Sequence, residues 1–150
     1  MMRVYLAGPL FSLAERSFNE ALALKLEQAF PSLEVILPQR HAAEIGQQPN
    51  FCQHMFAFSL DAIDAADAVV ALLDGADADS GTCVEIGYAR GKGNRVIGVR
   101  TDFRASEDRG LNLMAANVCS LLLIESSETA TIDGLARQIV AALAAGTSCR

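Results

Sequence analysis

The amino-acid sequence predicts an α/β protein of the flavodoxin-like, doubly wound class. Short apolar segments rich in branched residues alternate with longer segments whose apolar residues recur at helical spacing, and this alternation occurs five times. Glycine, proline and asparagine separate the segments. This alternation is typical of a mostly parallel sheet with helices on both faces and right-handed crossovers, for which the strand order 2-1-3-4-5 is the most economical.

The length of the chain limits the number of domains. The chain has 150 residues, of which 51% are hydrophobic. That is enough to build one hydrophobic core and too little for two ordinary domains. We therefore predict a single domain over residues 1–150.

The predicted helices have recognisable beginnings and ends. The first, over residues 12–30, begins with the capping box Ser12-x-x-Glu15. The helix after the third strand ends at the turn of residues 91–94, a short helix is expected over residues 111–118, and an amphipathic helix over residues 131–145. The strands are expected at residues 4–7, 33–37, 68–73, 95–99 and 120–124.

Two segments between these elements have no strand pattern. Residues 38–49 show no clear period and are expected to form a functional loop, and residues 101–110 a polar loop. Between them, Asn50 is expected to cap a further helix. The apolar stripe predicted for that helix is Phe51, Met55, Phe58, Ala62 and Ala65.

Composition excludes several classes of partner. The net charge is −6 and the twelve Lys and Arg residues form no basic run, which argues against a nucleic-acid surface. The four cysteines and two histidines lack the spacing of a zinc site, so we expect free thiols and no metal. The apolar N-terminal segment is short and broken by Gly8-Pro9, unlike a membrane span or signal peptide. We expect a cytoplasmic protein with a small-molecule ligand.

The most informative stretch is residues 79–90, which follows the predicted third strand. In an open α/β sheet of this order, the ligand crevice lies between the loops after strands 1 and 3. Tyr5, Gly8, Phe11, Asp79 and Glu85 are expected to face this crevice. Glu85 would lie in the first turn of a helix, where the helix dipole favours the ionised carboxylate that a nucleophile needs. Alternatively, Thr82-x-x-Glu85 is a capping box in which Glu85 serves its own helix.

The side chains available in this crevice are mostly carboxylates. With Asp61, Asp79, Glu85 and the phenol of Tyr5, they suit glycosyl transfer, in which one carboxylate attacks the sugar and a second group assists the leaving group. A cation loop at Asp74-x-x-Asp77-x-Asp79 lacks the register of an EF-hand. A flavin- or nucleotide-binding module and a response-regulator-like switch would use the same crevice, but neither explains Glu85.

Four motifs in this order resemble the nucleoside 2-deoxyribosyltransferases and their relatives, the deoxynucleoside-monophosphate N-glycosidases. They are Tyr5-Leu6-Ala7-Gly8-Pro9-Leu10-Phe11, Asp61 followed by Asp67-Ala68-Val69-Val70-Ala71, Asp79-Ser80-Gly81-Thr82-x-x-Glu85-Ile86-Gly87-Tyr88-Ala89, and Asn112-Leu113-Met114. The resemblance implies a retaining double displacement. Glu85 would attack the anomeric carbon of a 2′-deoxynucleoside, and a second base would displace the resulting deoxyribosyl ester.

The resemblance also implies roles for the other residues. Tyr5 would orient Glu85, Asp61 and Asp79 would contact the base and supply its proton, and Phe11, beside Gly8, would shape the sugar pocket. Gln39 would touch the base, and Asn112 and Met114 would reach into the site of a neighbouring subunit. The expected partners are therefore deoxynucleosides, free nucleobases and further copies of the chain in a homo-oligomer, with no cofactor.

The same resemblance leaves a second activity open. The relatives that hydrolyse nucleoside monophosphates place a serine six residues before the glutamate, and Asp79 at that position would repel a phosphate. Ser80 is one residue away, so a shifted loop would blur this distinction. The sequence favours base exchange over hydrolysis by an N-glycosidase and over a non-enzymatic nucleotide-binding module.

Overall fold

The computed structural model describes residues 1–46, 48–104, 111–125 and 130–147. The strands are β1 (Met2–Ala7), β2 (Leu33–Ile36), β3 (Ala68–Leu72), β4 (Arg95–Arg100) and β5 (Leu121–Ile124). The helices are α1 (Leu13–Ala29), α2 (Pro38–Ile45), α3 (Phe51–Asp64), α4 (Ser80–Gly91), α5 (Leu113–Val118) and α6 (Ile132–Thr147).

The five strands form one parallel sheet in the order β2-β1-β3-β4-β5, which confirms the predicted fold class. Val4 of β1 is in register with Ala68 of β3, and Ala68 with Arg95 of β4. The chain first adds β2 on one side of β1 and then crosses back to place β3 on the other side. This reversal opens a crevice at the carboxyl ends of β1 and β3, where doubly wound sheets bind their ligands.

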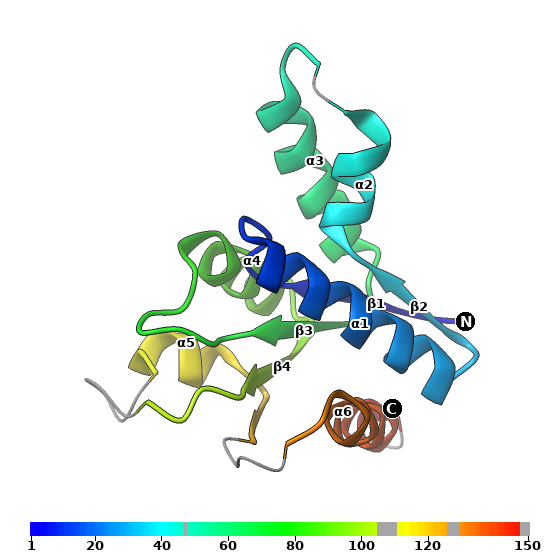
Figure 1. The fold of residues 1–150 in the computed structure, drawn as a ribbon, viewed down its shortest axis with the longest axis vertical. Coiled ribbons are helices and arrows are strands. Elements are labelled where there is room, and N and C mark those ends of the chain that lie inside the picture. Colours follow the sequence, from blue (N-terminus) through cyan, green and yellow to red (C-terminus); the bar gives the residue numbers. More distant parts are fainter. Residues whose placement is uncertain (47, 105–110, 126–129, 148–150) are drawn as a thin grey trace.

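Helices cover both faces of the sheet (Figure 1), and alternate strand residues point to opposite faces. Val4 and Leu6 belong to the core beneath α1 and α6. Tyr5 and Ala7 belong to the core beneath α3, α4 and α5. Tyr5 is thereby directed to the face on which α4 carries Glu85.

The predicted loop over residues 38–49 is wrong in its first half, because residues 38–45 form α2. Pro38 stands at the first helical position, where its missing N–H costs nothing and its fixed φ suits a helix. Eight residues with few large apolar side chains give too weak a period to be detected in the sequence. His41 of α2 stacks on Phe58 of α3, with ring centroids 3.8 Å apart and planes inclined by 10°.

Helix α3 differs from its predicted form at its start and in its packing. Asn50 adopts a left-handed φ of 67° and makes no side-chain capping bond. Only Ala62 and Ile63, in the last turn, are buried. The N-terminal part of α3 projects with α2 beyond the sheet (Figure 1), which leaves Phe51 and Met55 to line a pocket instead of the core.

The remaining predicted boundaries agree with the structure to within a few residues. The capping box of Ser12 and Glu15 is present in both directions. Asn112 caps α5 by accepting hydrogen bonds from the N–H groups of Met114 and Ala115, so this helix begins two residues later than expected. Residues 105–110 of the predicted polar loop lie outside the described part of the chain. Among the described helices, none combines the length and hydrophobicity needed to cross a membrane.

Candidate active site

A pocket of about 500 Å³ lies between the loop after β1, helices α2 and α3, and the first turns of α4. Its volume falls in the range of small-molecule sites. Most of its lining is apolar and includes Phe11, Pro38, Phe51, Met55, Phe56 and Leu60. Its polar side chains are Ser59, Asp79, Thr82 and Glu85. A ligand in this pocket would therefore be held mainly by apolar contact, with a few oriented oxygens.

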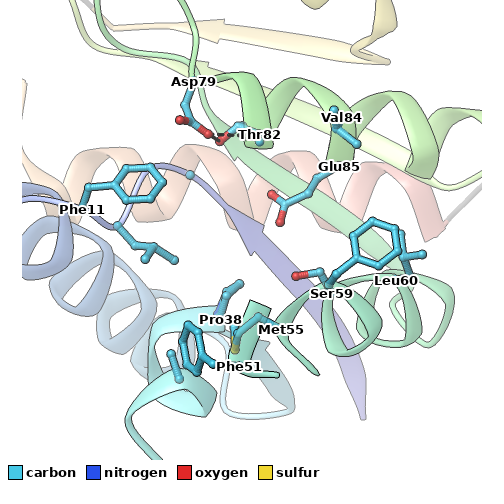
Figure 2. A pocket seen from close by; sticks show the side chains of 15 residues that line it. Phe11, Pro38, Phe51, Met55, Ser59, Leu60, Asp79, Thr82, Val84 and Glu85 are labelled. Carbon is cyan, nitrogen blue, oxygen red and sulfur yellow. Dashed lines mark hydrogen bonds between the residues drawn. The ribbon is translucent and has the colours of Figure 1, made fainter. Parts of the chain in front are cut away.

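Glu85 points into this pocket and does not cap its own helix (Figure 2). The cap of α4 is Asp79, whose Oδ2 accepts hydrogen bonds from the N–H of Thr82 at 2.8 Å and from its hydroxyl at 3.1 Å. The helix begins at Ser80, three residues before the start that a Thr82 cap requires. Glu85 consequently lies in the second turn of α4, where the helix dipole acts less strongly than in the first turn. Its side chain takes no part in capping the helix.

The carboxylate of Glu85 is held by two hydroxyl-bearing side chains from other elements. The phenol of Tyr5, at the end of a fully buried side chain on β1, donates to Glu85 Oε1 at 2.6 Å. The same phenolic oxygen lies 3.1 Å from Ser59 Oγ of α3. A strand and two helices therefore meet at one carboxylate, which fixes its orientation toward the pocket.

The surroundings of Glu85 act on its pKa in both directions. Burial raises this pKa most strongly, and the negative charge of Asp79 raises it further. The hydrogen bonds from Tyr5 and Ser59 lower it, because they stabilise the ionised form. Burial and the neighbouring Glu85 charge raise the pKa of Tyr5, so the phenol stays protonated and acts as a donor.

The loop that carries Asp79 is anchored at its start. Asp74 accepts hydrogen bonds from Thr101 and from the N–H of Asp102. The buried guanidinium of Arg100 donates to the carbonyls of Leu73 at 2.6 Å and Gly75 at 3.2 Å. Asp79 thus has a defined position relative to the sheet, and its Oδ1 makes no hydrogen bond to any described residue.

The acidic loop does not have the arrangement of a metal site. Asp74 is occupied by backbone N–H groups, and Asp79 by its helix cap. Within the described ranges, no three His, Cys, Asp or Glu side chains come together as ligands for a metal ion. The carboxylates of Asp74 and Asp79 act separately as hydrogen-bond acceptors.

The structure brings some of the predicted site residues together and leaves others outside. Gly8, Phe11, Asp79 and Glu85 line the pocket, and Tyr5 contacts Glu85 from below. Two predicted residues do not line the pocket in this structure: Asp61 is exposed on α3, and Gln39 belongs to a groove between α1 and α2.

The reasons are local. Asp61 follows Ser59 by two helical positions, a rotation of about 200° that turns it away from the pocket. The Gln39 amide donates to the carbonyl of Arg16 at 2.9 Å and accepts from Asn19 at 3.3 Å, so both its ends are occupied.

Asn112 and Met114, at the start of α5, lie beside a face of α4 that does not carry Glu85. They border a separate cavity with Ser80, Cys83 and Gly87. Met114 is 67% exposed. Neither residue lines the Glu85 pocket of its own chain.

Ser59 is the site residue that sequence reasoning missed. A lone serine carries no motif, and the predicted apolar stripe of α3 placed Phe58 on the inner face instead. The signal that could have found it is the spacing of Phe51, Met55 and Ser59, which are four residues apart and share one helix face.

A comparison with protein families agrees with this geometry. The family described as nucleoside 2-deoxyribosyltransferase matches residues 4–114, from β1 to the start of α5. The chain belongs to this family. The matched range contains Tyr5, Ser59, Asp79 and Glu85. No curated protein matches the chain significantly.

Solved structures of other proteins show the same fold. A conserved protein from Enterococcus faecalis V583 has a TM-score of 0.74 and 27% identity, covering 94% of this chain and 98% of that one. A 2-deoxyribosyltransferase from Bacillus psychrosaccharolyticus has a TM-score of 0.63 and 19% identity, covering 87% and 95%. A CMP N-glycosidase from Clostridium botulinum has a TM-score of 0.58 and 24% identity, covering 89% and 97%. The last two resemblances concern the fold alone.

Proposed function

We propose that the protein is a nucleoside 2-deoxyribosyltransferase that exchanges the base of 2′-deoxyribonucleosides. The observation that carries this proposal is the contact of Glu85 with Tyr5, at 2.6 Å, on the floor of an apolar pocket of ligand size. A carboxylate aimed into the pocket and held by a protonated phenol is equipped to attack an electrophilic sugar carbon. Membership of the deoxyribosyltransferase family supplies the substrate class.

In the proposed first step, Glu85 attacks C1′ of the deoxynucleoside. The new bond to C1′ forms as the bond from C1′ to the base nitrogen breaks, and the base takes the electron pair and a proton. A second base then attacks C1′ from the side that the first base left, losing a proton and releasing Glu85. Two inversions give net retention. Because deoxyribose lacks a 2′-hydroxyl, its oxocarbenium-like transition state forms readily.

Asp79 is the proposed partner for the proton of the base. It is the second carboxylate that lines the pocket, and its Oδ1 makes no hydrogen bond to a described residue. Asp61, which the resemblance also assigned to this role, lies outside the pocket. The apolar aromatic side chains around the site would stack on the base and exclude water, which favours transfer over hydrolysis.

The proposed enzyme acts as a homo-oligomer. Asn112 and Met114 do not line the Glu85 pocket of their own chain, and the resemblance assigns both to a neighbouring site. A second copy that presents this segment to the pocket would complete it. The proposed working partners are small deoxynucleosides, free bases and further copies of the chain, without a cofactor.

One incubation tests the reaction class. The protein is mixed with deoxyinosine and free adenine, and deoxyadenosine, hypoxanthine and free deoxyribose are separated by chromatography. Formation of deoxyadenosine is the expected result. Release of deoxyribose without exchange would instead indicate an N-glycosidase, and the absence of both products would contradict an enzymatic role on these substrates.

Variants of Glu85 assign the nucleophile. Glu85→Ala and Glu85→Gln should lower the exchange rate by at least about 10³-fold, because the covalent step is lost. Glu44→Gln removes an exposed carboxylate of α2 and should retain the wild-type rate. Near-normal exchange by Glu85→Gln would refute the assignment. A deoxyribosyl adduct on Glu85, seen by mass spectrometry of the protein quenched with substrate, would identify the intermediate.

A further inference from the structure

We propose that Ser59 is a positioning residue of this site and that its hydroxyl controls where Tyr5 directs its single proton. With Glu85 ionised, Ser59 would donate and Tyr5 would point its proton at the carboxylate. With Glu85 esterified by the sugar, Ser59 would accept the proton of Tyr5. This inference rests on the proposed function for its ester state, and on the geometry alone for its ionised state.

The hydroxyl of Tyr5 has one proton for two neighbouring oxygens. A phenol has one proton to donate, and Tyr5 Oη has two oxygen neighbours, Glu85 Oε1 at 2.6 Å and Ser59 Oγ at 3.1 Å. It can donate to only one of them at a time. The shorter contact, to a charged acceptor, takes the proton when Glu85 is ionised. Ser59 is then satisfied by donating its own proton to the phenol oxygen or to the carboxylate.

Because Tyr5 is buried, its hydroxyl depends on protein atoms for its hydrogen bonds. The Tyr5 side chain has no exposed surface, so water does not compete for its hydroxyl. Among the described residues, no buried side-chain oxygen or nitrogen lacks a hydrogen-bond partner. An ester oxygen is a weaker acceptor than a carboxylate, so a Tyr5 whose partner becomes an ester would be left poorly satisfied. Ser59 offers an acceptor within reach and removes this cost.

The charged groups near Glu85 are not placed to accept the proton of Tyr5 in place of Ser59. Tyr5 of β1 and Asp79 at the start of α4 are the titratable groups that act on Glu85. Asp64, the acidic side chain of α3 that packs on α4, is occupied by Tyr88 and Lys92 at 3.0 Å each. Ser59 is therefore the polar side chain of α3 that joins the Tyr5–Glu85 pair, through its contact with the phenol of Tyr5 at 3.1 Å, and it lowers the pKa of the Glu85 carboxyl against the effect of burial.

The test measures the ionisation of Glu85 directly and then the reaction. In protein labelled with carboxyl-13C glutamate, the Glu85 signal is assigned from the Glu85→Gln variant and titrated with pH. Ser59→Ala should move the Glu85 pKa upward by about half a unit to one unit, the effect of one lost hydrogen bond. The acidic limb of the pH profile of kcat/KM for base exchange should move upward by the same amount.

Three further variants separate positioning from a general loss of structure. Ser59→Thr keeps the hydroxyl and should restore the titration and most of kcat. Ser59→Cys keeps the side-chain size with a much weaker donor and should behave as Ser59→Ala does. Ser17→Ala makes the same deletion on an exposed face of α1 and should change nothing.

The proposal would be overturned by an unshifted Glu85 titration in both Ser59→Ala and Ser59→Cys, or by failure of Ser59→Thr to restore it. Failure of the proposed function is a different result. If the wild-type protein exchanges no bases, the NMR titration still reports whether Ser59 acts on Glu85.

Discussion

At the scale of single residues, the site keeps a carboxylate in surroundings that oppose its charge. Burial and Asp79 raise the pKa of Glu85, and the hydroxyls of Tyr5 and Ser59 partly offset that effect. In its proposed role as nucleophile, a carboxylate that is neither fully solvated nor fully neutralised would retain reactivity toward carbon. The folded state therefore holds Glu85 in a less favourable environment than the unfolded chain does.

The first residue-scale prediction concerns stability. Because the folded state raises the Glu85 pKa above its unfolded value near 4.5, ionisation of this group opposes folding. Its favourable contribution is complete below the unfolded pKa and is lost as the pH rises through the folded pKa. Glu85→Gln should therefore raise Tm by about 2–4 °C at pH 8, with a gain that disappears near pH 4. Thermal unfolding of both proteins across this pH range measures it.

The matched control is Glu44→Gln, whose exposed carboxylate has no such environment. Its Tm should stay within about 1 °C of the wild type at every pH, because only a partly exposed pair with His41, at 3.9 Å, is lost. A Glu85→Gln variant that is less stable than the wild type at pH 8 would show that the hydrogen bond from Tyr5 outweighs the cost of burial.

The second residue-scale prediction concerns phosphate. Asp79 places a negative charge at the N-terminus of α4, where the free N–H groups would otherwise attract an anion. Asp79→Ser keeps a capping oxygen and removes the charge. The rate with deoxycytidine 5′-monophosphate relative to deoxycytidine should rise about tenfold, equivalent to about 1.4 kcal/mol of removed repulsion.

Asp77→Ser provides the comparison for Asp79→Ser. It removes an exposed charge from the same loop at a residue that does not line the Glu85 pocket. Its ratio of rates should match the wild type. An equal gain in both variants would assign the effect to the net charge of the loop and not to Asp79.

At the scale of elements, β4 packs closely against the segment after α5. A Cβ built on Gly98 would lie 2.6 Å from Cys119 Sγ and 2.9 Å from Leu122 Cδ1. Gly98→Ala should therefore lower the free energy of unfolding by about 1–3 kcal/mol through overpacking. Urea unfolding of this variant and of Gly91→Ala, whose Cβ would meet no atom within 4 Å, checks the prediction. Equal midpoints for the two would contradict it.

The helices and strands differ in how well the sequence predicted them. The corner from β3 to α4 was predictable because a fully buried strand, an acidic loop and a capped helix follow one another within 24 residues, from Ala68 to Gly91. Helix α2 was missed because its eight residues rely on Pro38 and on packing with α3. The inner face of α3 was misjudged because periodicity gives no information on where a helix leaves the sheet.

At the scale of the whole molecule, the strand order determines most of the site. Placing β3 beside β1 brings Tyr5 under α4, and parallel strands put the loops after Ala7 and Leu73 at one edge. These relations follow from topology, so the crevice and most of its residues were predictable. Ser59 and Asp61 were not, because two positions on α3 lie on opposite sides of the helix. Which of the two faces the pocket depends on how α3 packs against α4.

Several large apolar side chains near the pocket are exposed to solvent. Phe56, Val84 and Met114 are each more than 60% exposed and lie on α3, α4 and α5, which cover the same face of the sheet. Phe56 and Val84 also line the pocket. Large apolar side chains left in solvent near a ligand site are typical of a surface that a partner covers. A second copy of the chain, as in the proposed oligomer, would bury them.

The last prediction tests whether sites are shared between copies. Glu85→Gln removes the proposed nucleophile, and a double variant, Asn112→Ser with Met114→Ala, changes the proposed donated segment while keeping an oxygen cap on α5. Each protein alone should exchange bases poorly.

In a mixed two-fold assembly, one site combines the intact Glu85 of one chain with the intact segment of the other. Unfolding and refolding the variants together at equal amounts should therefore recover about a quarter of the wild-type rate, since half of the dimers are mixed and each has one intact site. If each pocket were built from one chain alone, co-refolding would give no more than the average of the two separate rates.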